Sequence, residues 1–175
     1  MTWIFGYGSL IWDPSFAYRD ARPACLHGWR RRFWQGSPDH RGIPTAPGRV
    51  VTLVEDEAAA CWGIAFNVSG SDTNRIFDAL DARESGGYVR MSVDIEFADD
   101  TCIRATTYLA LPDNDNFLGP ASTSQIAAQI RECAGRSGHN VDYVLRLASA
   151  LRDFDVFDEE VHGLEACLKA LSDGQ

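Results

Sequence analysis

The chain has 175 residues, of which 45% are hydrophobic, and its formal net charge is −9 at pH 7. This length suits one compact domain over residues 1–175, which buries roughly two thirds of the surface of the unfolded chain. The acidic charge argues against a nucleic-acid-binding protein, because phosphate backbones are bound by basic surfaces. Composition thus predicts a single globular domain with no nucleic-acid partner.

The five cysteines are an odd number and contain no Cys-x-x-Cys pair, which is typical of reduced thiols in a cytoplasmic protein. The first residues lack the basic and apolar regions of a signal peptide, and no apolar run approaches the ~18 residues of a membrane-spanning helix. The four histidines have no metal-ligand spacing, among themselves or with the cysteines. We therefore expect a cytoplasmic protein without a membrane partner and without a metal.

The first predicted strand, residues 3–7, runs into the segment Phe-Gly-Tyr-Gly-Ser-Leu at residues 5–10. Gly6 and Gly8 permit backbone conformations that a Cβ would forbid. Backbone N–H groups in such a turn can point together at a carboxylate or an oxyanion. The residues alone leave two interpretations open, a small-ligand loop or an ordinary glycine turn that ends a strand.

Further apolar runs separated by turn signals predict strands at residues 24–34, 50–54, 61–68, 91–97 and 102–111. Such a series is typical of a sheet curled into a barrel. Arg30, Arg31 and Arg32 lie inside the first of these runs, among aromatic residues. This pattern is shared by RNA-binding surfaces and by half-exposed strands, and the acidic composition favours a strand.

Helices are predicted at residues 72–82 and throughout the C-terminal part of the chain, so the fold class is α+β. Ser122 and Gln125 form a capping box at the start of one C-terminal helix. Two further helices carry apolar stripes, at residues 141–151 and 161–171. We expect these helices to pack against the barrel.

Glu84 differs from the other acidic residues, most of which fall in turns or on helix surfaces. It follows the predicted helix and precedes Gly86, Gly87 and Tyr88. A carboxylate on a short loop between a helix and a strand can overhang a pocket. The alternatives are a solvated loop residue or an ion pair with Arg83.

Several blocks of sequence, taken in order, resemble the ChaC-like γ-glutamylcyclotransferases that act on glutathione. The blocks lie at residues 5–12 (FGYGSLIW), 31–37 (RRFWQGS), 39–44 (DHRGIP), 47–56 (PGRVVTLVED), 62–63, 83–88 (RESGGY), 108, 118–120 and 140–143. The resemblance runs nearly end to end. It implies a small mixed β-barrel with flanking helices and no cofactor.

The resemblance also implies that the small-molecule substrate glutathione is converted to 5-oxoproline and cysteinylglycine, with Glu84 as general base and acid. The predicted substrate-binding residues form the N-terminal strand and loop, which are Ile4, Phe5, Gly6, Tyr7, Gly8, Ser9 and Leu10. Three weaker candidates, which would bind the glycyl end or orient Glu84, are Arg41, Tyr108 and Tyr143.

One position departs from the family pattern, because Ser85 stands where the family usually has lysine. We expect this change to alter local electrostatics or substrate preference without removing the base. Two other functions stay open. One is a cyclotransferase for other γ-glutamyl amino acids or amines, and the other is a non-catalytic binding protein of the same fold, against which the presence of Glu84 in its motif argues.

Overall fold

The computed structural model describes residues 1–173. Two compact units are present, one made of Met1–Arg31 with Leu53–Leu111 and the other of Arg32–Thr52 with the chain from Pro112 onward. The long strands β2 and β3 contribute residues to both units. A single domain over residues 1–175 stays a prediction.

Five strands form a closed barrel in the order β1-β3-β2-β4-β5. Their bounds are Thr2–Gly6 for β1, Asp20–Ser37 for β2, Gly48–Val68 for β3, Tyr88–Phe97 for β4 and Cys102–Ala110 for β5. Strand β1 pairs antiparallel with β3 and parallel with β5. The barrel is therefore mixed, and the predicted fold class is confirmed.

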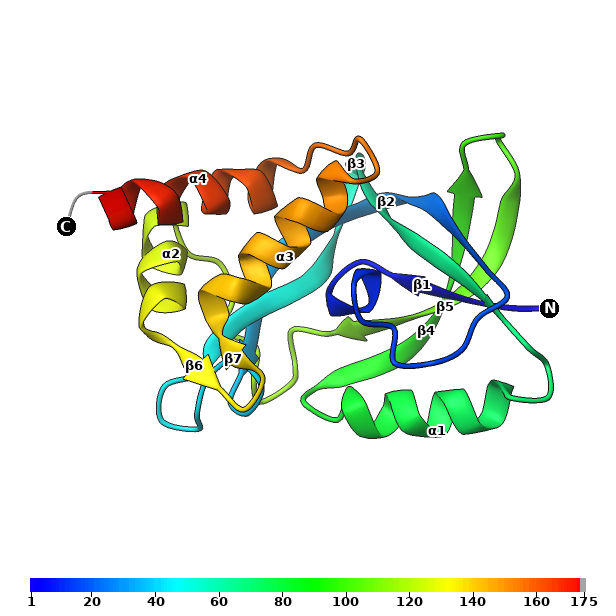
Figure 1. Cartoon of the computed structure of the whole chain (residues 1–175), viewed down its shortest axis with the longest axis horizontal. Helices are drawn as coiled ribbons and strands as arrows, with labels where there is room; N and C mark the ends of the chain where they lie inside the picture. Colours follow the sequence, from blue (N-terminus) through cyan, green and yellow to red (C-terminus); the bar gives the residue numbers. More distant parts are fainter. Residues whose placement is uncertain (174–175) are drawn as a thin grey trace. The chain divides into compact units, whose positions relative to one another are not determined.

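Helix α1 (Thr73–Arg83) belongs to the first unit and lies alongside β4 and β5 in Figure 1. It buries one apolar face, made of Ile76, Phe77 and Leu80, as its 3.6-residue periodicity predicts. This face joins a core cluster that includes Ile4 of β1. The end of α1 and the end of β1 are thus supported by the same core.

Three helices, α2 (Thr123–Glu132), α3 (Asn140–Arg152) and α4 (Glu159–Asp173), pack against one another in the second unit (Figure 1). The predicted capping box of Ser122 and Gln125 is present. A short hairpin of β6 (Ala134–Gly135) and β7 (Gly138–His139), which was not predicted, joins α2 to α3. Among the described residues, no helix combines the length and apolar character needed to cross a membrane.

The predicted strands at residues 50–54 and 61–68 belong to one strand, β3, so the expected break was wrong. The intervening residues are mostly polar or small and largely exposed, which makes them look like a turn in sequence. Asp56 lies in this stretch and forms an ion pair of 2.6 Å with Arg30 of β2. Partners on the neighbouring strand therefore hold the segment extended despite its weak local strand signal.

Candidate active site

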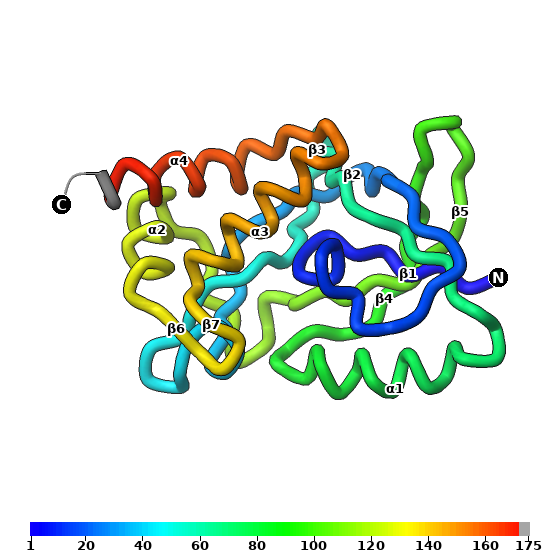
Figure 2. Tube along the Cα trace, viewed as in Figure 1, coloured from blue at the N-terminus to red at the C-terminus, as the bar shows by residue number. Residues whose placement is uncertain are grey.

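Strand β1 leads directly into a short 3₁₀ helix, η1 (Ser9–Ile11), which Figure 2 traces as the tight coil after the N-terminal strand. Arg31 fixes the start of this loop, because its Nε donates to the Tyr7 carbonyl at 2.9 Å and its Nη2 donates to the Trp62 carbonyl at 2.6 Å. The Arg31 side chain is buried, so its charge depends on these carbonyl acceptors. The loop is thereby anchored to β2 and β3.

Strand β5 fixes the same loop from its other side. The Tyr7 hydroxyl donates to the Tyr108 carbonyl at 2.7 Å, and the Thr107 hydroxyl donates to the Phe5 carbonyl at 2.8 Å. Of the seven predicted loop and strand residues, Gly8 and Ser9 are partly exposed and the other five are buried. Direct access to a ligand is therefore concentrated at Gly8 and Ser9.

Glu84 lies immediately after α1, as predicted. Its N–H donates to the Leu80 carbonyl at 2.8 Å, which ends the helix, and its own carbonyl accepts from Tyr88 N at 3.2 Å. Gly87 has a φ of 110°, which an L-residue rarely adopts, so a glycine is required for this turn into β4. The turn thus places the Glu84 carboxyl group at the junction between α1 and β4.

The Glu84 side chain is 17% exposed. Burial raises the pKa of its carboxyl above the ordinary value, and the positive charge of Arg83 opposes that rise without cancelling it. A carboxyl with a raised pKa exchanges protons closer to neutral pH than a solvated one. The environment of Glu84 therefore suits a general base.

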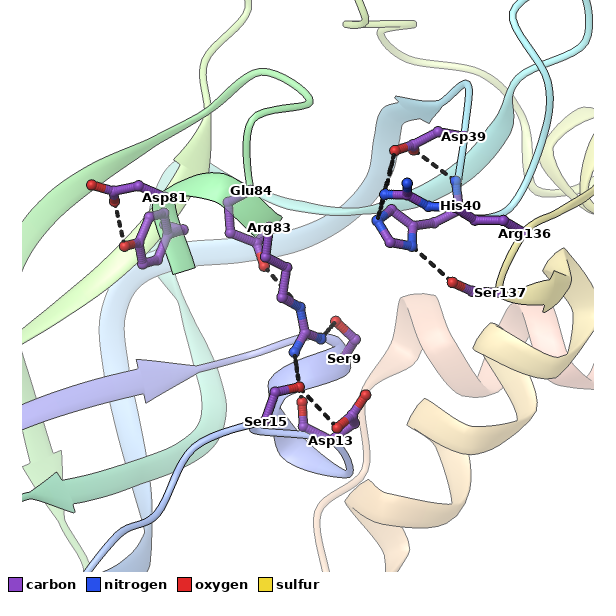
Figure 3. Close-up of polar contacts among 11 residues, drawn as sticks. Ser9, Asp13, Ser15, Asp39, His40, Asp81, Arg83, Glu84, Arg136 and Ser137 are labelled. Carbon is purple, nitrogen blue, oxygen red and sulfur yellow. Dashed lines mark hydrogen bonds and ion pairs between the residues drawn. The ribbon is translucent and has the colours of Figure 1, made fainter. Parts of the chain in front are cut away.

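Arg83 brings the carboxyl and the loop together (Figure 3). Its Nη2 donates to Ser9 Oγ at 2.9 Å, while its Nε lies 3.4 Å from Glu84 Oε1. Two groups that are 75 positions apart in sequence thus contact one guanidinium. The ion pair with Arg83, which the sequence offered as an alternative role for Glu84, is present alongside this arrangement.

Tyr108, one of the weaker candidates, forms a hydrogen bond within the first unit. Its hydroxyl donates to Asp81 Oδ1 at 2.6 Å, and Arg90 forms an ion pair with the same carboxylate. Burial, and then the bond to Asp81, raise the pKa of Tyr108. Asp81 precedes Glu84 by three residues, so Tyr108 contacts α1 within one turn of the carboxyl.

We expect Tyr108→Phe to lower kcat by less than about tenfold, because Arg90 still holds Asp81 when the hydroxyl is removed. Steady-state kinetics with glutathione, the substrate that the family resemblance implies, would measure the effect. A loss of several hundredfold would show instead that the hydroxyl contacts the reacting atoms.

Arg41 and Tyr143 belong to the second unit, where they contact each other. The Arg41 guanidinium lies 5.7 Å from the centre of the Tyr143 ring, and its Nη1 donates to the His139 carbonyl at 3.0 Å. The Tyr143 hydroxyl accepts from Val51 N at 3.5 Å. Burial lowers the pKa of Arg41. These contacts show how both side chains are held, and their role in binding stays a prediction.

A serine, a histidine and an aspartate also meet in the second unit (Figure 3). His40 Nδ1 lies 2.7 Å from Ser137 Oγ, and Arg136 Nη2 lies 2.7 Å from His40 Nε2 and 3.0 Å from Asp39 Oδ2. Because a guanidinium only donates, His40 Nε2 is the acceptor and Nδ1 carries the proton. Ser137 Oγ therefore accepts a hydrogen bond from His40 Nδ1–H. A histidine that donates to the serine cannot act as its base, so this cluster does not activate a serine nucleophile.

The sequence did not identify Arg31, Asp81 or the contact of Arg83 with Ser9. Arg31 lies in an apolar run that predicts a strand, and its support of the loop is seen only in its hydrogen bonds to the Tyr7 and Trp62 carbonyls. Asp81 falls within the predicted helix at residues 72–82 and is one of the acidic residues that the sequence places on a helix surface. The one available signal was the adjacency of Arg83 to Glu84. Within residues 1–173, no three His, Cys, Asp or Glu side chains gather as metal ligands.

Comparisons with known proteins agree on the family. The model of the ChaC-like protein family matches residues 2–171. A glutathione-specific γ-glutamylcyclotransferase 1 from Danio rerio is 45% identical over 174 residues, covering 96% of this chain and 89% of the relative. The human protein of the same name is 47% identical over 154 residues, covering 86% of this chain and 69% of the relative.

Solved structures agree on the fold. The crystal structure of a glutathione-specific γ-glutamyl cyclotransferase from yeast superposes with a TM-score of 0.91 at 26% identity, covering 97% of this chain and 96% of that one. A γ-glutamyl cyclotransferase at 19% identity shares the fold with a TM-score of 0.60, over 94% of this chain and 86% of that one. The fold is thus that of the γ-glutamyl cyclotransferases. Within it, the chain belongs to the ChaC-like protein family.

Proposed function

We propose that this protein is a γ-glutamylcyclotransferase that acts on glutathione. The observation that carries the proposal is the Arg83 guanidinium in contact with both the Ser9 hydroxyl and the Glu84 carboxyl. A partly buried carboxyl next to a loop of backbone donors is the kind of site that such a reaction requires. Relatives 45% and 47% identical to the chain carry the name of this activity, which supports the proposal.

The proposed reaction is intramolecular. The α-amino nitrogen of the γ-glutamyl group attacks its own γ-carbonyl carbon, and the amide bond to the cysteinyl nitrogen breaks. The products are 5-oxoproline and cysteinylglycine, and no water is consumed. Because nucleophile and electrophile belong to one molecule, a site that holds the substrate bent supplies much of the rate acceleration.

Glu84 moves the proton in this scheme. The substrate α-amino group is an ammonium at neutral pH and must lose a proton before it attacks. The Glu84 carboxylate accepts that proton, and the resulting carboxylic acid returns it to the departing cysteinyl nitrogen. The raised pKa of Glu84 suits both steps, since the group then takes up and releases a proton near the working pH.

The strand and loop at residues 4–10 form the proposed binding site for the γ-glutamyl group. The first N–H groups of a helix have no acceptor within it, and at the start of η1 they belong to the partly exposed end of the loop. We assign Gly8 and Ser9 to contact with the substrate α-carboxylate or the tetrahedral oxyanion. Ile4, Phe5, Gly6, Tyr7 and Leu10 form the buried support of that contact.

The function is tested by incubating the purified protein with glutathione and quantifying 5-oxoproline and cysteinylglycine by mass spectrometry. We expect both products in equal amounts, and a higher kcat/KM for glutathione than for γ-glutamylalanine or γ-glutamyl-lysine. Preference for one of the other two would support a cyclotransferase of different specificity. No lactam from any of the three would support a non-catalytic binding protein.

The pH dependence gives a second prediction. Glu84 must be ionised to accept a proton, so kcat/KM should rise with pH through the raised pKa of this carboxyl. On the acid side of the pH profile (the acid limb), the midpoint of the rise in kcat/KM is therefore expected above the pKa of about 4.3 that an exposed glutamate has. A profile of kcat/KM between pH 4 and 9 measures it, since roughly that range brackets carboxyl and imidazole titration. An acid limb at the ordinary glutamate value would contradict the assignment.

A cytoplasmic location is also inferred, and it is supported by the state of the cysteines. All five lie in the part of the chain that the structure describes, where none forms a disulfide, and three of them are buried. Reduced, packed cysteines are typical of proteins in a reducing compartment.

A further inference from the structure

Arg83 lies at the last position of α1, next to Glu84, and its side chain is 22% exposed. Besides the contacts with Ser9 and Glu84, its Nη1 donates to the Asp13 carbonyl at 2.9 Å and to Ser15 Oγ at 2.7 Å. The guanidinium thus holds both ends of the loop segment Ser9 to Ser15 against the end of the helix. Figure 3 shows the side chain reaching from α1 toward both serines.

The direction of the hydrogen bond to Ser9 has a chemical consequence. A guanidinium has donors and no acceptor, so Ser9 Oγ must accept from Arg83 Nη2. The single hydroxyl proton of Ser9 is then directed to a different acceptor. Because Ser9 is partly exposed at the loop that we assign to substrate contact, an anionic oxygen of the substrate is the acceptor that this geometry favours.

The other end of the segment is held in a conformation that needs support. Ser15 has a φ of 62°, in the left-handed region that a residue with a Cβ adopts at a cost. Its hydroxyl accepts from Arg83 and donates to Asp13 Oδ1 at 3.0 Å. The arginine therefore stabilises the turn after η1 at Asp13 and Ser15 and also holds the Ser9 side chain directly.

The charge of Arg83 also acts on Glu84. The guanidinium opposes the effect of burial on the pKa of the carboxyl, and the charge of Glu84 in turn contributes to the raised pKa of Tyr108. Removal of the positive charge should therefore leave the carboxyl a weaker acid than it is in the wild type.

We propose that Arg83 is a positioning residue of the γ-glutamylcyclotransferase reaction, which joins the substrate loop to the general base and directs the Ser9 hydroxyl proton at the substrate. This inference rests on the proposed function, since it assigns a role within that site. A purely structural arginine would contribute to stability and leave the pH profile of catalysis unchanged.

The test compares Arg83→Gln, Arg83→Lys and the control Arg75→Gln in the full-length protein. Arg75 lies on the same helix, has a side chain that is 79% exposed and pairs with Asp72 at 3.4 Å on the surface. The readouts are kcat and KM for glutathione across the pH range, together with thermal unfolding. The wild type is assayed first, because its turnover tests the proposed function independently of any variant.

We expect Arg83→Gln to lower kcat/KM by about ten- to a hundredfold and to move the acid limb to higher pH. Arg83→Lys keeps the charge but not the forked geometry, so it should raise KM while the acid limb stays near the wild-type position. Arg75→Gln should match the wild type in every readout. These results together would support the positioning role.

A double-mutant cycle with Ser9→Ala decides whether Arg83 acts through Ser9. We expect the combined variant Ser9→Ala with Arg83→Gln to lose less than the sum of the two separate losses. Additive losses would overturn the proposal in favour of direct substrate binding by Arg83. An Arg83→Gln variant with wild-type kinetics and pH profile would overturn it too, whereas a wild type that releases no 5-oxoproline would overturn the proposed function and this inference with it.

Discussion

Glu84→Gln is expected to lower kcat for lactam formation from glutathione by at least about a hundredfold, because general acid and base catalysis commonly contributes 10²- to 10⁴-fold. The amide is nearly isosteric with the carboxyl and leaves the turn between α1 and β4 intact, since that turn is held by backbone bonds to Leu80 and Tyr88. The variant loses the capacity to accept and return a proton, together with the negative charge of the ion pair with Arg83. Product quantification under single-turnover conditions measures the effect.

Binding should survive the same change. We expect calorimetric titration of Glu84→Gln with glutathione to give a dissociation constant within about threefold of the wild-type KM, because the proposed binding site is supplied by the loop and not by the carboxyl. Asp78→Asn is the matched control, since Asp78 is an exposed carboxylate on the same region of α1. Wild-type turnover in Glu84→Gln would rule out Glu84 as the base.

The pH dependence of thermal stability gives an independent test of the raised pKa of the Glu84 carboxyl. Burial raises the folded-state pKa of Glu84, so its stabilising contribution is present below its unfolded-state pKa and is lost as the pH rises through the folded-state value. Glutamine mimics the protonated form at every pH. The Gln variant should therefore equal the wild type in thermal stability near pH 4 and exceed it at pH 8. A variant that is less stable at pH 8 would show that the ionised carboxylate is stabilising.

The parts of the fold that the sequence predicted well are those with a local signal. Helix α1 was expected at residues 72–82 and spans Thr73–Arg83, because its apolar face repeats with the helical period. The Ser122 cap was found because its partner lies three residues away. The continuity of β3 was missed because it depends on a partner strand and on an ion pair 26 positions away in sequence.

The candidate site shows more clearly that only features with a local signal can be predicted from the sequence. Glu84 was singled out from its local context, a carboxylate between a helix and two glycines. Its proximity to Ser9 has no local signal, and it was expected only from the resemblance to a family. The contacts of Arg31 and Arg83 with the loop span 24 and 74 positions, and no pattern of composition or periodicity encodes which carbonyl or hydroxyl a distant arginine reaches.

Gly63→Ala is expected to disrupt both the fold and the site, because Gly63 of β3 packs directly against the end of β1. A Cβ at this position would overlap the Gly6 carbonyl oxygen and lie 2.8 Å from Phe5 Cζ. The carbonyl is backbone and the Phe5 side chain is fully buried, so neither can move aside without displacing the strand. Overpacking of this kind costs about 1–3 kcal/mol and often more.

That displacement should pass directly to the substrate loop, since Gly6 is the last residue of β1 and the loop begins at Tyr7. We expect Gly63→Ala to lower Tm by about 5–10 °C and kcat/KM by at least about tenfold. Gly70→Ala is the matched control, because a Cβ there has no heavy atom within 4 Å, and it should leave both quantities at or slightly above the wild-type values. Differential scanning calorimetry and steady-state assays well below Tm separate the two effects. A Gly63→Ala protein with wild-type stability would mean that β1 and its loop move apart from β3 at little cost, and that hydrogen bonds such as those of Arg31, Tyr7 and Thr107 are enough to anchor the loop.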